Sequence, residues 1–151
     1  MTFPVLQVFQ AVESHALELG RFERVNTHEP KNAPGHGLTC AIWTEHLEAI
    51  RQSGLASTSA VLRMFIRIYQ NMVSEPQDAI DPNVIEATSL LFDEYCGDFE
   101  LGGLIRNVDI LGSAGLPLQA RAGYIGQDKV LFRCMTITLP LIINDAWNQE
   151  S

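Results

Sequence analysis

The sequence predicts an α+β fold: a mostly antiparallel β-sheet with two main helices packed on one of its faces. Three observations lead to this prediction. Two segments, 5–19 and 81–95, carry apolar residues at spacings of three and four, which places them along one side of a helix. Two others, Thr58–Tyr69 and Val130–Ile143, have the two-residue alternation of strands. Strands are expected on both sides of the second helix along the chain, which is typical of α+β proteins.

The composition is that of one globular domain spanning residues 1–151. Apolar residues make up 46% of the chain and charged residues 19%, which excludes wholesale disorder. The 18 acidic and 10 basic residues give a formal charge of −8. Because phosphate binding needs clustered Lys and Arg, this balance disfavours a protein that grips nucleic acid through a basic surface.

The first elements are predicted to be a helix, a short strand and a loop. Val5–Leu19 has its apolar residues at helical spacing, and Gly20 is the expected stop, because glycine readily adopts the left-handed conformation that ends helices. Phe22–Asn26 is predicted to be a short strand. Thr27–Gly37 contains two prolines and two glycines, which indicates a loop.

Two longer strands should follow. Leu38–Thr44 is predicted to be a strand, and Thr44–Gln52 its continuation into a loop rather than a turn of helix. Thr58–Tyr69 is the clearest strand, because one of its sides is fully apolar and predicts a covered sheet face. The two sides of this strand are Leu62, Met64, Ile66 and Ile68, against Arg63, Phe65, Arg67 and Tyr69.

The second helix is predicted after a loop over Asn71–Ala79. Asp81 is the expected N-cap and Pro82 suits the first helical position. Gly97 should end the helix. Its expected buried stripe is Val84, Thr88, Leu91, Phe92 and Tyr95.

The last third of the chain is predicted to supply the remaining strands. Leu104–Leu111 leads into a turn at Gly112–Gly115, and Leu118–Tyr124 is the next strand. Residues 126–129 have the composition of a hairpin turn into the long strand Val130–Ile143. The remaining residues, 144–151, are expected to form a polar tail.

The sequence offers no catalytic or cofactor-binding motif: it lacks a nucleophile elbow, a P-loop, a Cys-x-x-Cys pair and a His-Glu-x-x-His helix. We therefore predict no enzyme, no cofactor and no metal. The best metal candidate is the loop from His28 to His36, which would need Glu45, His46 or Glu48 as further ligands. A solvated polar loop is the favoured interpretation.

The three cysteines, Cys40, Cys96 and Cys134, show no paired spacing and are expected to be free, mostly buried thiols in a reducing compartment. The longest apolar-rich stretch is interrupted by Arg133 and is shorter than the ~20 residues of a membrane helix. The first ten residues carry no positive charge, so no signal peptide is expected. We therefore expect folding in a cytosol, without a membrane partner.

Five residues are candidates for contacts with a partner. Arg63 and Arg67 either contact a neighbouring subunit or nucleic acid, or lie over the aromatic residues of a half-exposed sheet face. Trp147 either docks on its own domain or anchors a partner. Asp98 and Glu100 belong to an acidic cluster with Asp93 and Glu94 at the end of the second helix. Solvation is the favoured explanation of that cluster, although carboxylates are unfavourable near a helix C-terminus and a partner could contact them.

The order of elements resembles that of the tail terminator proteins of long-tailed bacteriophages, over the whole chain. The likeness rests on the helices Val5–Leu19 and Asp81–Tyr95, the strands Leu38–Trp43 and Thr58–Tyr69, and the closing hairpin of 118–124 with 130–143. The closing stretch, RAGYIGQDKVLFRCMTITLPLIINDAW, is also similar to tail-region proteins of phages that infect actinobacteria.

The resemblance implies a structural virion protein of the tail-neck region, assembled in the host cytoplasm. Such proteins form a six-fold ring on the tail tube, stop its growth and receive the head-side connector or neck proteins, while DNA passes through the channel. Six copies would carry six times −8, or −48, formal charges, and an acidic lumen would let DNA slide rather than hold it.

Two alternatives stay open. A neck or head-completion protein of the same particle shares a broadly similar fold. A small α+β enzyme or ligand-binding domain would use the His28–His36 loop or the acidic cluster, and would present a pocket with perturbed titratable groups.

Overall fold

The computed structural model describes residues 4–27, 38–50, 57–72, 80–127 and 130–148. In chain order, these residues form a helix, three strands, a second helix and three further strands. The elements are α1 (Val5–Leu19), β1 (Arg24–Asn26), β2 (Thr39–Ile50), β3 (Ser57–Asn71), α2 (Ile80–Gly97), β4 (Asn107–Val108), β5 (Gln119–Gln127) and β6 (Val130–Asn148).

Over the part of the chain that the structure describes, six strands join in one sheet. The order is β1-β2-β3-β6, and the far side of β6 pairs with β5 along its first half and with β4 further on. β1 runs parallel to β2, whereas the other pairings are antiparallel. The predicted α+β fold with a mostly antiparallel sheet is therefore confirmed.

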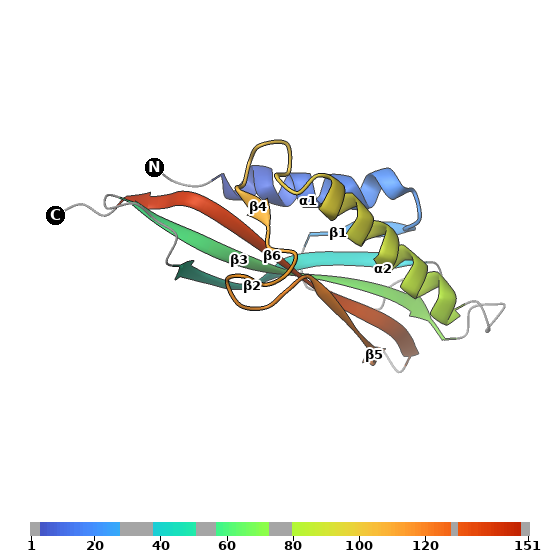
Figure 1. Cartoon of the computed structure of the whole chain (residues 1–151). Coiled ribbons are helices and arrows are strands. Elements are labelled where there is room, and N and C mark those ends of the chain that lie inside the picture. The colour runs from blue at the N-terminus through green and yellow to red at the C-terminus, as the bar shows by residue number, and fades with distance from the viewer. Residues whose placement is uncertain (1–3, 28–37, 51–56, 73–79, 128–129, 149–151) are drawn as a thin grey trace.

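Both helices cover the same face of this sheet, as predicted (Figure 1). Because side chains alternate along a strand, every second residue of β3 faces the helices, and burying one such Leu or Ile contributes ~1.5–3 kcal/mol. Neither described helix is long and apolar enough to cross a membrane. The core between helices and sheet includes Val8, Val12 and Ala16 of α1, Val84, Leu91 and Tyr95 of α2, and Leu62, Met64, Ile66 and Ile68 of β3.

The helix ends differ from the sequence prediction at one point. Gly20 ends α1 in the left-handed conformation, with φ 65°, and Gly97 is the last residue of α2, both as predicted. However, α2 begins at Ile80, so Asp81 lies in its first turn and is not the N-cap. The Asp81 carboxylate instead accepts a hydrogen bond from Nε of Arg133 on β6, at 2.9 Å.

The strands also differ from their predicted bounds. β2 runs through to Ile50, which confirms the preferred continuation, whereas Leu104–Leu111 contributes only the two residues of β4. β6 reaches Asn148, so the predicted polar tail is mostly strand. The physical reason is that β3 begins at Ser57 and supplies backbone partners for these residues. The predicted loops lie outside the described residues over 28–37 and 73–79.

Candidate protein-interaction surface

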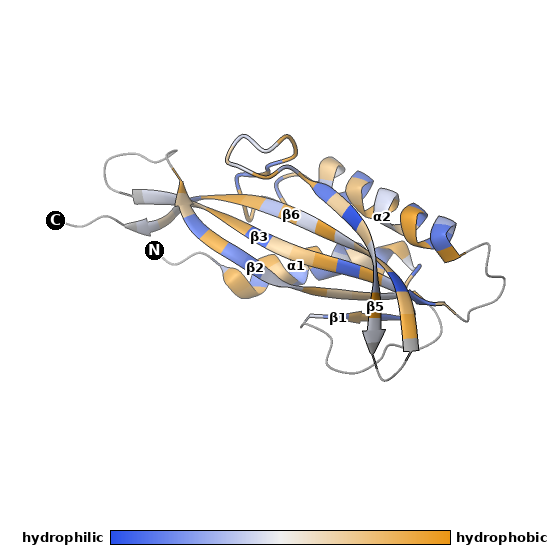
Figure 2. Cartoon of the chain, turned by 90° about the horizontal axis from the view of Figure 1, so that it is seen from below, coloured by the Kyte–Doolittle hydropathy of each residue, from blue (hydrophilic) through white to orange (hydrophobic). Residues whose placement is uncertain are grey.

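Among the described residues, no helix covers the other face of the sheet, which we call the open face (Figure 2). Cross-strand pairing builds its central row, because directly paired residues share a face. Ala41 of β2 pairs with Arg67 of β3, Arg67 with Thr136 of β6, and Thr136 with Arg121 of β5. One row therefore brings two arginines to the open face on either side of a threonine.

Arg67, a predicted contact residue, is half-buried and held in place on the open face. Its Nε donates to Oγ1 of Thr136 at 3.0 Å, and its guanidinium carbon lies 5.1 Å from the ring centre of Trp43. Trp43 packs edge-on against Phe65 at 5.8 Å. The arginine therefore lies over an aromatic side chain, as one of the two alternatives expected, although the ring belongs to the neighbouring strand.

A hollow of about 500 Å³ lies on this face between β3, β6 and β5. Both charged side chains that line it are arginines, Arg67 and Arg121, and none of its lining residues is acidic among those described. Arg121 was not among the residues predicted from the sequence to contact a partner. Its place in the predicted strand Leu118–Tyr124 was the one signal for the sheet face on which it lies. The hollow is also lined by Phe65, Leu116, Tyr124 and Thr136.

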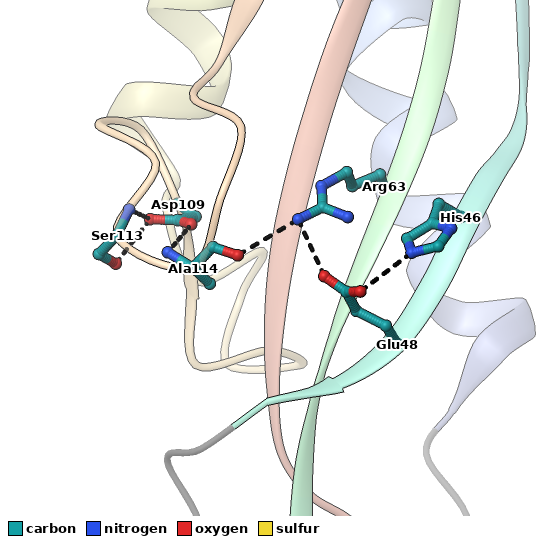
Figure 3. Close-up of polar contacts among 6 residues, drawn as sticks. All are labelled: His46, Glu48, Arg63, Asp109, Ser113 and Ala114. Atoms are coloured by element: carbon teal, nitrogen blue, oxygen red, sulfur yellow. Dashed lines mark hydrogen bonds and ion pairs between the residues drawn. The ribbon is translucent and has the colours of Figure 1, made fainter.

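Arg63, the other predicted contact arginine, is structural. Only 6% of the residue is exposed. Its Nη2 donates to Oε1 of Glu48 and to the carbonyl of Ala114, each at 3.2 Å (Figure 3). His46 Nε2 lies 3.2 Å from the other Glu48 oxygen. Hydrogen bonds from His46 first and then Arg63 hold the pKa of Glu48 below its usual value. A partner contact was one of the two alternatives expected for Arg63; in the structure its guanidinium makes these contacts within its own chain.

The loop that Arg63 holds is closed by a buried carboxylate. Asp109 is 3% exposed and accepts hydrogen bonds from the backbone N–H and Oγ of Ser113 and from the N–H of Ala114, at 2.8–2.9 Å. Gly115 follows with φ 139°, and a Cβ there would lie 2.5 Å from Nη2 of Arg63. Glycine suits this position because L side chains rarely adopt this φ, and a Cβ would in addition displace the guanidinium of Arg63.

The favoured prediction was that the acidic cluster at the end of α2 is solvated. In the structure, two of its carboxylates also contact a histidine of α1. Asp98 accepts from Nε2 of His15 at 2.8 Å and from the N–H of Gly102 at 3.0 Å, and these bonds lower the pKa of Asp98. Glu94 lies 3.8 Å from Nδ1 of the same histidine. Glu100 is exposed. His15 was missed because nothing in the sequence links two residues 83 positions apart.

One group among the described residues could hold a metal ion. His15, Glu18 and Glu94 bring ligand atoms within 4.8 Å of one another, and a nitrogen with carboxylate oxygens suits a divalent cation. The predicted metal candidate, the loop from His28 to His36, lies outside the described residues. The further ligands proposed for it, His46 and Glu48, bind each other.

Trp147 is on β6, opposite Thr58 of β3, and is 37% exposed. Its predicted position in a polar tail is wrong, although a partly exposed Trp at the end of a strand still suits a partner contact. The cysteines are free, as expected. Burial raises the pKa of Cys40 to about 12 and also raises that of Cys134, whereas Cys96 is exposed.

Comparison with protein-family models and with curated proteins found no match to this sequence.

Proposed function

We propose that the protein is a tail terminator of a long-tailed bacteriophage: a structural protein that forms a ring on the end of the finished tail tube. In this role, copies of the chain bind one another and the tube protein, so that tube growth stops. The ring then receives the connector or neck proteins of the head. DNA passes through the channel without specific binding, and no catalytic step takes part.

The observation that supports this proposal is the one-sided arrangement of the fold. The helices cover one sheet face, and the other carries a hollow of about 500 Å³ that is lined in part by apolar side chains. Leu116, which lines the hollow, is 49% exposed, and Phe65, also in its lining, is half-buried. A partly apolar face with polar residues around it is typical of protein-binding surfaces. The proposal also rests on the resemblance to that family that the sequence shows.

The net charge is compatible with a DNA channel. A ring of six copies would carry −48 formal charges, which is six times −8. Since phosphate attraction dominates binding without sequence specificity, a strongly acidic assembly would not retain the DNA that passes through it.

The test measures the mass of the purified protein, alone and mixed with the tube protein from the same genome, while electron microscopy records tube length. We expect a closed ring of about six copies, or a monomer that caps tubes and stops their growth. A monomer or dimer beside tubes that keep growing would refute the proposal. Binding to the neck connector without binding to tubes would instead assign the protein to the neck.

A further inference from the structure

Within the described residues, β2 and β5 lie on opposite sides of the sheet and each has a stretch of edge without a partner strand (Figure 1). β1 pairs with β2 only at Thr39, Cys40 and Ala41, so the outer edge of β2 beyond these residues pairs with no described strand. β5 pairs with β6 alone, and no strand within the described ranges lies on its other side. Unpaired edges present rows of N–H and C=O groups and are templates for strand addition.

The two edges carry opposite charges. Residues 44–49 of β2 are exposed and include Glu45 and Glu48. Glu45 lies at a β-bulge and has no cross-strand partner on β3, because the pairing passes from Thr44 directly to His46. β5 carries Arg121, which is exposed, and no acidic residue. Charge complementarity therefore favours contact between these unlike edges over contact between two copies of the same edge.

Each edge also carries an exposed apolar side chain on the helix-covered face. Leu47 pairs with Leu62 of the core, so it lies on the helix-covered face, where it is 45% exposed. Tyr124 pairs with Arg133, whose guanidinium binds Asp81 of α2 and lies 4.6 Å from the Tyr124 ring, so it lies on that face too. The glycines and alanines of β5 leave room for a neighbouring strand beside its edge.

We propose that the β2 edge of one copy pairs with the β5 edge of the next, which brings the Glu45 carboxylate close to Arg121. We call this contact between copies the joint. This inference rests on the proposed ring. β2, β3, β6 and β5 are antiparallel in succession, so β2 and β5 run in opposite directions and a sheet continued across the joint is antiparallel. The two edges differ, so the contact is head-to-tail and leads to a closed ring when its rotation closes.

The test is a charge reversal in the full-length protein. Arg121→Glu and Glu45→Arg are made singly and together, and the protomer concentration at half assembly is measured by native mass spectrometry or light scattering. The matched control reverses Arg21 and Glu86, an ion pair of 3.0 Å whose side chains are both about half exposed. This pair joins the end of α1 to α2 and includes no residue of β2 or β5.

We expect each single reversal at the joint to raise the half-assembly concentration about tenfold or more at low salt, because two like charges then face each other. The double reversal should recover most of this loss. At ~1 M salt, where the Debye length is ~3 Å, the single variants should approach the wild type. The control reversals should shift the concentration by less than about twofold.

Each outcome decides between the joint and the ring. If the wild type assembles and Arg121→Glu behaves like Arg21→Glu, the joint is refuted and the proposed function stands. If the wild type neither assembles nor caps tubes, the proposed function fails and the joint with it. Should Arg121→Glu fail to fold, judged by circular dichroism, Arg121→Gln removes the charge alone. Unchanged assembly of Arg121→Gln at low salt would then refute the joint.

Discussion

Replacing Arg63 with methionine should destabilise the protein by about 2 kcal/mol, although the sequence predicted Arg63 on a half-exposed sheet face or at a partner contact. Methionine keeps an apolar stem of similar length in the buried site and removes only the guanidinium. The guanidinium donates to the Ala114 carbonyl and to Glu48, each at 3.2 Å.

The magnitude follows from what each partner loses. The Ala114 carbonyl is part-buried, and a hydrogen bond to it from a charged donor contributes ~1.5–3 kcal/mol. Glu48 is 44% exposed at its side chain and returns to water, so it adds no large cost. A small gain offsets the loss, because Nε of Arg63 is buried without a hydrogen-bond partner among the described residues.

Urea unfolding measures the change. With a slope of ~2 kcal/mol per M, the midpoint should fall by about 1 M at an unchanged slope. Arg67→Met is the control, since Arg67 is only half-buried and its guanidinium bonds to the Thr136 side chain; we expect it to cost less than ~1 kcal/mol. An Arg63→Met midpoint at or above that of Arg67→Met would refute the structural role of Arg63.

Two further predictions test contacts between α1 and the end of α2, and a third tests the burial of the cysteine thiols. The pKa of Asp98 lies below its usual 3.8, so its bond to His15 stabilises the fold above that pH and is lost as pH falls through the lowered pKa; NMR titration of His15→Gln should show the Asp98 pKa rising toward 3.8. Tyr95→Phe should cost about 1 kcal/mol in urea unfolding, because the buried hydroxyl donates to the Val12 carbonyl at 2.9 Å, and an unchanged midpoint would contradict this bond. A thiol reagent should modify Cys96 quickly in the folded protein and the two buried cysteines only after urea is added; three equally fast thiols would contradict their burial.

Local patterns in the sequence were enough for most of the elements. The apolar spacing of Val5–Leu19 and the stop at Gly20 depend on residues within a few turns of each other, and the structure has both. The alternation along Thr58–Tyr69 gave the covered side of β3 correctly for the same reason. The errors lie where a segment distant in sequence decides the secondary structure. Trp147 is in a strand because β3 pairs with it, not because of its neighbours in sequence.

The candidate surface was less predictable than the fold. Alternation put Arg63 and Arg67 on the same side of one strand, and it could not distinguish them. Arg63 is covered because the loop at Ala114 folds over it, 51 positions away, whereas Arg67 borders an open hollow. Arg121 joins Arg67 across β6, and that row depends on the register of three strands.

The sequence by itself determined the fold class, the two helices, the covered face of β3 and the strongly acidic charge, because periodicity and composition are local properties of the chain. Only the tertiary structure decided which arginine is buried, that His15 meets Asp98, and that the edges of β2 and β5, which pair with no further described strand, carry opposite charges. Those features depend on which distant segments pair and in which register, and the energy that selects the register comes from burying many side chains at once.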